Sequence, residues 1–202
     1  VTWSSDVCSS DLVAVFFDFG GSNTSPATNQ DTTSLGPPNL RFKTADDATI
    51  DNQNPIPIPS GAAVNSFWKQ IYLKVTGGTF TQIDNVKFYT DATPFGTGIT
   101  TYVGDQMPTK NSGSDAGYVV ATGTVGTSGN AMVASHAGVS AQTDAFSFDS
   151  SSPKSITISE AGSLMNATNE TTDYLVCQMN VASTAGPGNL ADETWTYQYD
   201  EI

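Results

Sequence analysis

The chain is poor in basic residues. Lysine and arginine supply 7 of its 202 residues, against 20 aspartates and glutamates, which gives a formal net charge of −13. Proteins that bind DNA or RNA meet the phosphate backbone with clustered lysines and arginines. The low count therefore argues against nucleic acid as a partner.

Long apolar runs and strong helix formers are scarce as well. No apolar stretch approaches the ~20 residues that a membrane-spanning helix needs. Glutamate occurs only four times, whereas Thr, Ser, Gly, Asn and Pro, all weak helix formers, make up 90 residues. A hydrophobic share of 38% is still enough to fill a core. We therefore expect a β-rich globular domain without a membrane span.

Histidine and cysteine are nearly absent, which limits the available chemistry. The single histidine, His136, lies in a run of small residues, and we expect it to be solvated in a loop. One histidine supports neither a convincing Ser–His–Asp triad nor a zinc site. Cys177 shares one strand face with Leu175 and Met179, which predicts a buried thiol that behaves as a small hydrophobe. We expect the protein not to be an enzyme.

The first twelve residues differ from the rest. The run of residues 6–12, D-V-C-S-S-D-L, resembles a translated sequencing-adapter oligonucleotide, and residues 1–12 lack both strand alternation and signal-peptide anatomy. We expect this segment to be non-native, with a single domain over residues 13–202. On that interpretation Cys8 is foreign, Cys177 has no disulfide partner, and any leader sequence has been lost. An ordinary Ser-rich tail is the alternative.

Apolar and polar residues alternate with period 2 along much of the chain, and clusters of turn residues separate the alternating runs. This pattern predicts an all-β fold, an antiparallel β-sandwich of jelly-roll or immunoglobulin-like type. A polar loop is expected over residues 20–38, an extended proline-rich covering segment over 55–59, and a helical turn over 160–166. About nine strands are expected, over residues 13–19, 39–43, 67–75, 83–90, 118–124, 146–148, 155–159, 172–181 and 194–199.

The clearest predicted unit spans residues 67–91. Ile71, Leu73 and Val75 alternate with polar residues, two glycines follow at 77 and 78, and the next strand carries Val86 and Phe88. This arrangement predicts a β-hairpin, with a bulge near residues 84–85.

An acidic run suggests a cation site. Five Asp and Asn side chains fall within nine residues, and calcium prefers such hard oxygen ligands. Asp and Asn also cap turns with their own side chains, so an ordinary acidic loop is the alternative. The candidate calcium ligands are Asp46, Asp47, Asp51, Asn52 and Asn54.

Aromatic and acidic residues offer two further possibilities. An exposed aromatic platform would bind carbohydrate or a cell surface, and its candidate members are Trp68, Tyr72, Tyr89 and Tyr102. A glycoside hydrolase needs two carboxylates around the scissile bond, which residues 192–193 and 200–201 offer as a weaker alternative. Trp195, Tyr197 and Tyr199 alternate as a core face should.

Charge is unevenly placed along the chain. Residues 155–202 contain seven acids and no Lys or Arg, and every basic residue lies between Arg41 and Lys154. A subunit polarised in this way can dock its basic half against the acidic half of a neighbour.

Three runs, residues 39–47, 67–91 and 192–202, resemble uncharacterised β-sandwich proteins of prokaryotic viruses and environmental genomes, among them virion and surface components. The resemblance implies a non-enzymatic structural protein, located in a virion or outside the cell. Such a protein would bind copies of itself or other structural subunits through edge strands or the arm at residues 20–38. A glycan-binding module is the alternative function. The resemblance supplies no catalytic or binding residues, and no cofactor other than calcium is expected.

Overall fold

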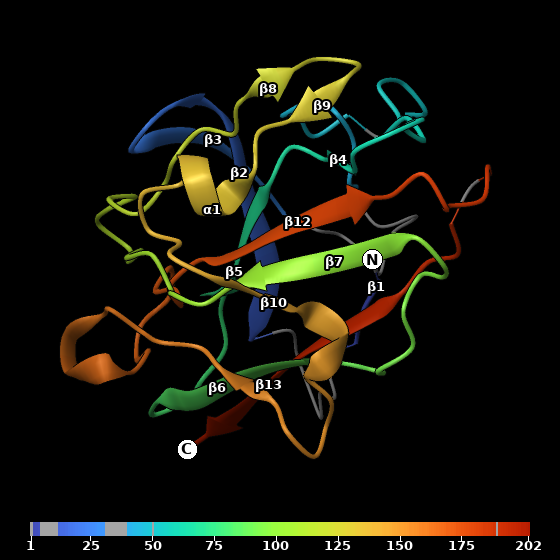
Figure 1. The fold of residues 1–202 in the computed structure, drawn as a ribbon. Helices are drawn as coiled ribbons and strands as arrows, with labels where there is room; N and C mark the ends of the chain where they lie inside the picture. Colours follow the sequence, from blue (N-terminus) through green and yellow to red (C-terminus); the bar gives the residue numbers. More distant parts are fainter. Residues whose placement is uncertain (1, 5–11, 31–39, 50, 189) are drawn as a thin grey trace.

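The computed structural model describes residues 2–4, 12–30, 40–49, 51–188 and 190–202, and within them thirteen strands form two sheets (Figure 1). The predicted all-β sandwich is confirmed. The strands are β1 (Thr2–Ser4), β2 (Val13–Ser22), β3 (Ser25–Gln30), β4 (Val64–Asn65), β5 (Lys69–Val75), β6 (Ile83–Thr90), β7 (Ile99–Gly104), β8 (Gly123–Thr124), β9 (Ser128–Gly129), β10 (Gln142–Asp144), β11 (Lys154–Ser155), β12 (Leu175–Val181) and β13 (Thr194–Glu201).

The smaller sheet has the order β1-β13-β6-β11. Its centre is the antiparallel pair of β6 and β13, whereas β1 runs parallel to β13. The register slips between Gln198 and Asp200, opposite Asn85, whose φ of 48° is left-handed. The predicted bulge near residues 84–85 is therefore confirmed.

Whether residues 1–12 are foreign stays a prediction.

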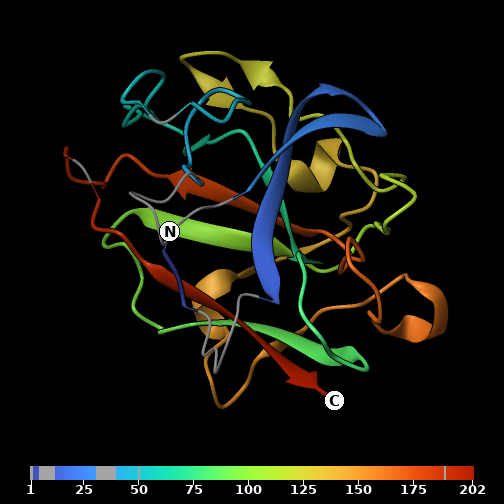
Figure 2. The ribbon, with the colours of Figure 1, turned by 180° about the vertical axis from the view of Figure 1, so that it is seen from behind.

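The larger sheet is built around β12. One edge of β12 pairs with β5 and then β4, the other pairs with β7, and β2 and β3 continue the sheet beyond β5. The predicted loop at residues 20–38 is wrong in its described part, because β2 and β3 form a hairpin there (Figure 2). Residues 31–38 lie outside the described residues.

The predicted hairpin over residues 67–91 is also wrong, although both strands exist. β5 lies between β2 and β12 in the larger sheet, and β6 lies between β13 and β11 in the smaller one. The connection around Gly77 and Gly78 therefore crosses from one sheet to the other. Both edges of β5 are taken by other strands, so local sequence proximity does not decide its pairing.

The main core lies between the two sheets. Phe17, Ile71 and Leu175 from the larger sheet meet Phe88 and Trp195 from the smaller one, and all five are at most 1% exposed. The rings of Phe88 and Trp195 are 5.3 Å apart and nearly perpendicular, a favourable edge-to-face geometry. The predicted core face of β13 is confirmed by the burial of Trp195 and Tyr197.

A second core covers the opposite face of the larger sheet. Trp68, Tyr72 and Val176 are buried there against Tyr118 and Met132, which belong to the long connection over residues 105–141. This connection holds the short helix α1 (Met132–Ser135) and little other regular structure. β5 and β12 are consequently buried on both faces.

Other predicted elements are shorter than expected or different in type. Residues 40–43 lie in no strand, and residues 145–147 form a 3-10 turn where a strand was expected. Of the strand expected over residues 118–124 only β8 is present, and of the strand expected over residues 155–159 only the last residue of β11 is present. The predicted helical turn is a 3-10 turn at Ala161–Ser163.

Candidate functional site

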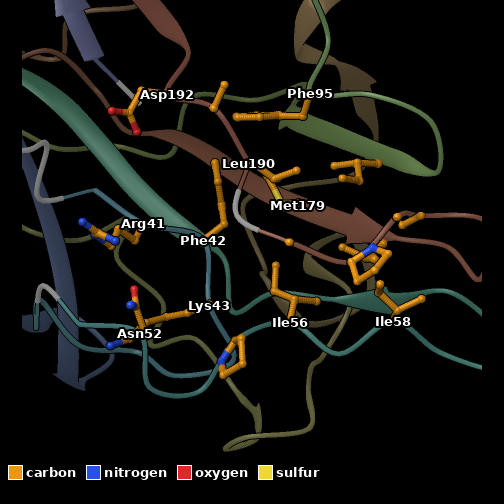
Figure 3. A pocket seen from close by; sticks show the side chains of 18 of the residues that line it. Arg41, Phe42, Lys43, Asn52, Ile56, Ile58, Phe95, Met179, Leu190 and Asp192 are labelled. Atoms are coloured by element: carbon orange, nitrogen blue, oxygen red, sulfur yellow. The ribbon is translucent and has the colours of Figure 1, made fainter.

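A groove of about 780 Å3 opens where β12 ends (Figure 3). Met179 and Val181 of β12 contribute to its floor together with Ile99 at the start of β7. One wall comes from residues 40–43 and 51–58, the other from residues 185–188 and 190–192. The groove is therefore framed by loops on a rigid sheet, the usual arrangement of a binding site.

Apolar side chains dominate the groove. Phe42, Ile56 and Phe95 pack against the cluster of Met179, Val181 and Ala185. At the rim, Ile58 is 40% exposed and Leu190 is 38% exposed, so apolar surface faces the solvent. Residues 55–59 form no strand, and Pro55, Ile56 and Ile58 line one wall of the groove, while the extended character of the segment stays a prediction. The groove suits a partner with an apolar group.

Arg41 brings a positive charge to the groove, which Asp51 and Asp192 also line. Lys43, beside it, is neutralised by Asp47 at 2.7 Å and Asp51 at 3.2 Å. The Nε of Arg41 is buried and has no hydrogen-bond partner among the described residues. Figure 3 shows Arg41 and Asp192 toward the same end of the groove, on its two walls. A carboxylate on an incoming partner would satisfy the guanidinium.

The predicted calcium ligands are tied to lysines and to the backbone. Asp47 and Asp51 bind Lys43, and Asp46 accepts a hydrogen bond from the Gly20 amide and lies 4.0 Å from Lys69. Burial raises the pKa of Asp46, against the opposing charge of Lys69. No three His, Cys, Asp or Glu side chains gather as metal ligands in the part of the chain that the structure describes.

The two asparagines of that set do not join the carboxylates around a common point. Asn52 lines the groove, and the Asn54 carbonyl accepts hydrogen bonds from the Thr44 amide and hydroxyl. The calcium site stays a prediction.

The predicted aromatic platform is wrong for two of its four members. Trp68 is 1% and Tyr72 is 2% exposed, because the connection over residues 105–141 covers this face of β5. The Trp68 indole donates to the Val119 carbonyl at 3.0 Å. Tyr89 and Tyr102 are half-buried and belong to different sheets, so the four rings form no common surface.

His136 is buried, which overturns the prediction of a solvated loop histidine. It is 2% exposed, and its Nδ1 accepts from the Gly138 amide, so its Nε2 donates to Gln70 Oε1 at 2.7 Å. Burial lowers the pKa of His136 to about 4. The imidazole is a neutral structural group that fastens the outer connection to β5.

Cys177 is buried, as predicted. Its thiol faces the Lys69 carbonyl at 3.6 Å, and burial raises the pKa of Cys177 to about 12. A thiol in this state is a poor nucleophile.

The two acidic pairs considered for glycoside hydrolysis lie at opposite ends of β13. Asp192 lines the groove, whereas Asp200 lies near the other end and accepts a hydrogen bond from Asn85 at 2.8 Å. The pairs do not converge on one cleft.

Sequence reasoning missed a buried charged centre around Lys110. Its Nζ lies 3.4 Å from Asp18 Oδ2 and also contacts Asp115 Oδ1. The same atom lies 4.3 Å from the ring centroid of Tyr72 and 5.1 Å from that of Tyr174. One amine thus meets two carboxylates inside an aromatic enclosure.

Three hydroxyls complete this centre. Thr28 Oγ1 and the Tyr72 hydroxyl donate to Asp18 Oδ1 at 2.6 and 3.2 Å, and the Tyr174 hydroxyl donates to Asp18 Oδ2. Burial and the adjacent charge of Asp18 raise the pKa of both tyrosines well above its usual value, so both keep their protons. The one feature of the sequence that could have indicated this centre is Asp18, a charged residue between Phe17 and Phe19 in an apolar strand.

Comparison with family models, with curated proteins and with solved structures finds no match for the chain. Among the described residues, no helix is long and apolar enough to cross a membrane.

Proposed function

We propose that the protein is a non-enzymatic structural subunit that assembles head to tail with copies of itself, in a virion or on an extracellular surface. The groove of one copy receives the end of β13 of the next. The observation that carries the proposal is the complementarity of these two surfaces.

The end of β13 carries acidic and apolar side chains that complement the groove. Asp200 and Glu201 are exposed acids, and the adjoining Ile202 is 66% exposed. Backbone hydrogen bonds between Ile202 and Gln82 hold this end in place. An apolar side chain next to carboxylates matches an apolar groove that contains Arg41, whose buried Nε has no hydrogen-bond partner among the described residues.

The two surfaces cannot meet within one molecule. Asp192 lies at the groove, and β13 then runs away from it for eight residues, about 25 Å of extended chain. Figure 1 shows β12 ending at the upper right and the C-terminus at the lower left. Contact therefore requires two copies, and because the surfaces differ, each copy can bind one neighbour at each end.

Sedimentation velocity over a range of protein concentrations tests this proposal. The native chain is expected to form concentration-dependent oligomers that weaken with salt. Arg41→Glu and Glu201→Lys each place like charges opposite one another and should weaken association at least ~10-fold. Lys74→Glu, the same charge change away from both surfaces, is the control. A native chain that stays monomeric at all concentrations would refute the proposal.

A further inference from the structure

We propose that the side chains of Lys110 and Asp18 condense to an intramolecular amide, a covalent cross-link between β2 and the connection that follows β7. The inference does not depend on the proposed assembly. It rests on the contents of the buried centre: a nucleophile, an electrophile, a base, an acid and two hydrogen-bond donors.

The nucleophile and the electrophile are already adjacent and shielded from water. Lys110 Nζ lies 3.4 Å from Asp18 Oδ2, and the two side chains are 7% and 0% exposed. Reacting atoms held at ~3–3.5 Å gain most of the advantage of an intramolecular reaction. Amide formation also removes two opposite charges from the protein interior, where charges are costly to keep.

Asp115 is the base in this arrangement. Lys110 and Asp115 flank a tight turn closed by reciprocal hydrogen bonds between Asn111 and Ser114, and the turn brings Asp115 Oδ1 against Nζ. The Lys110 backbone amide donates to Asp173 Oδ1 at 2.8 Å, which fixes this loop beside β12. Asp115 therefore accepts a proton from the ammonium group and leaves a neutral amine.

The hydroxyls supply the remaining groups. When Nζ bonds to the Asp18 carboxyl carbon, negative charge develops on Oδ1, where Thr28 and Tyr72 already donate. The Tyr174 hydroxyl touches Asp18 Oδ2 and also lies 3.2 Å from Asp115 Oδ1. It can pass protons from Asp115 to Oδ2, which is the leaving oxygen.

The reaction balances without any further reactant. Lys110 starts with three ammonium protons: two leave with Oδ2 as water, and one stays on the amide nitrogen. The bond from the Asp18 carboxyl carbon to Oδ2 breaks, and the bond from that carbon to Nζ forms. Asp115 and Tyr174 return to the protonation states in which they started. A cavity of about 870 Å3, lined in part by Tyr72, Lys110 and Asp115, borders the centre and gives the water an exit.

Mass spectrometry of the intact, folded chain tests the cross-link. The measured mass should be lower than the sequence mass by one water molecule. Trypsin does not cut at an acylated lysine, so digestion should yield residues 1–41 joined to residues 88–154. A full sequence mass would overturn the proposal. So would a water loss with these two peptides separate, because the loss would then lie at another site.

Two variants and a control assign the roles. Lys110→Arg keeps the positive charge but has no amine to acylate, so it should show the full sequence mass, whereas Lys154→Arg should still lack one water. Asp115→Asn should form the link at least ~100-fold more slowly. A water loss that persists in Lys110→Arg would contradict the assignment, and an unchanged rate in Asp115→Asn would contradict the role of the base. The native chain alone decides the question if a variant fails to fold.

Discussion

Buried amide and imidazole side chains join the outer connection to the larger sheet. Gln178 is 1% exposed, its Nε2 donates to the Ser66 and Asn130 carbonyls at 2.7 and 2.8 Å, and its Oε1 accepts from the Met132 amide at 2.9 Å. Gln70 makes a similar set of bonds to Val119 and His136. These side chains satisfy backbone groups that irregular chain cannot pair by itself.

Replacing Gln178 with Leu should therefore be costly. The substitution leaves two carbonyls and one amide without partners, and we expect the free energy of unfolding to fall by about 3 kcal/mol. Urea denaturation measures this change. Gln198→Leu, on the exposed face of β13, is the matched control and should change stability by no more than about 0.5 kcal/mol. Equal losses in the two variants would contradict the role assigned to Gln178.

The buried imidazole should make the protein sensitive to acid. Burial lowers the pKa of His136 to about 4, below its ordinary value of 6.5. The unfolded chain therefore binds a proton first as pH falls, and stability is lost between about pH 6.5 and 4, by about 3 kcal/mol in all.

Urea denaturation across this pH range provides the measurement. His136 is the only histidine of the chain, so His136→Gln should flatten the stability curve between pH 6.5 and 5, where few carboxylates titrate. An unchanged slope in that variant would show that another group is responsible.

At the level of single residues, the sequence predicted apolar burial well and polar burial poorly. Cys177, Trp195 and Tyr197 lie on apolar strand faces, and alternation is enough to place them in the core. Gln70, Tyr72 and Gln178 occupy the alternate positions, which alternation assigns to solvent. They are buried because residues 105–141 pack over them, and no local sequence pattern predicts that packing.

At the level of elements, strand existence was more predictable than strand pairing. β2, β6, β12 and β13 were expected close to their observed positions, because a half-buried strand alternates regularly. The pairing of β5 was not predictable, since its two neighbours, β2 and β12, are distant in sequence. The Lys110 centre was not predicted for the same reason: its members come from β2, β3, β5, the residue before β12 and a loop.

The short strand β9, which lies between β4 and β8, depends on close backbone approach. At Gly129 in β9, an added Cβ would lie 2.0 Å from the Ser66 carbonyl oxygen and 2.5 Å from its carbon, both backbone atoms. Gly129→Ala should therefore separate β9 from β4 and cost about 2 kcal/mol of stability in urea denaturation.

Gly61 provides the control for that experiment. Among the residues that the structure describes, nothing lies within 4 Å of a Cβ built at Gly61. Gly61→Ala should leave stability unchanged or raise it by up to about 1 kcal/mol. A tolerated Gly129→Ala would contradict the tight contact between β9 and the Ser66 backbone.

At the level of the whole molecule, the chain forms a sandwich with one additional covering layer and two dissimilar ends. The groove end presents Arg41 among apolar side chains, and the β13 end presents acids beside an exposed isoleucine. The uneven charge of the sequence suggested a polarised subunit, which stays a prediction, and the groove itself is assembled from distant segments and has no sequence signature. An internal cross-link at Lys110 would suit a subunit that bears load between two neighbours.

The most direct test of head-to-tail assembly is to mix two variants, each lacking one end. Arg41→Glu keeps an intact β13 end, and the double variant Asp200→Asn, Glu201→Gln keeps an intact groove, without creating a new opposite-charge pair between the two altered surfaces. Each protein alone should sediment as a monomer, and an equimolar mixture should form a one-to-one dimer that grows no further. A mixture that stays monomeric, or variants that still assemble alone, would contradict the account.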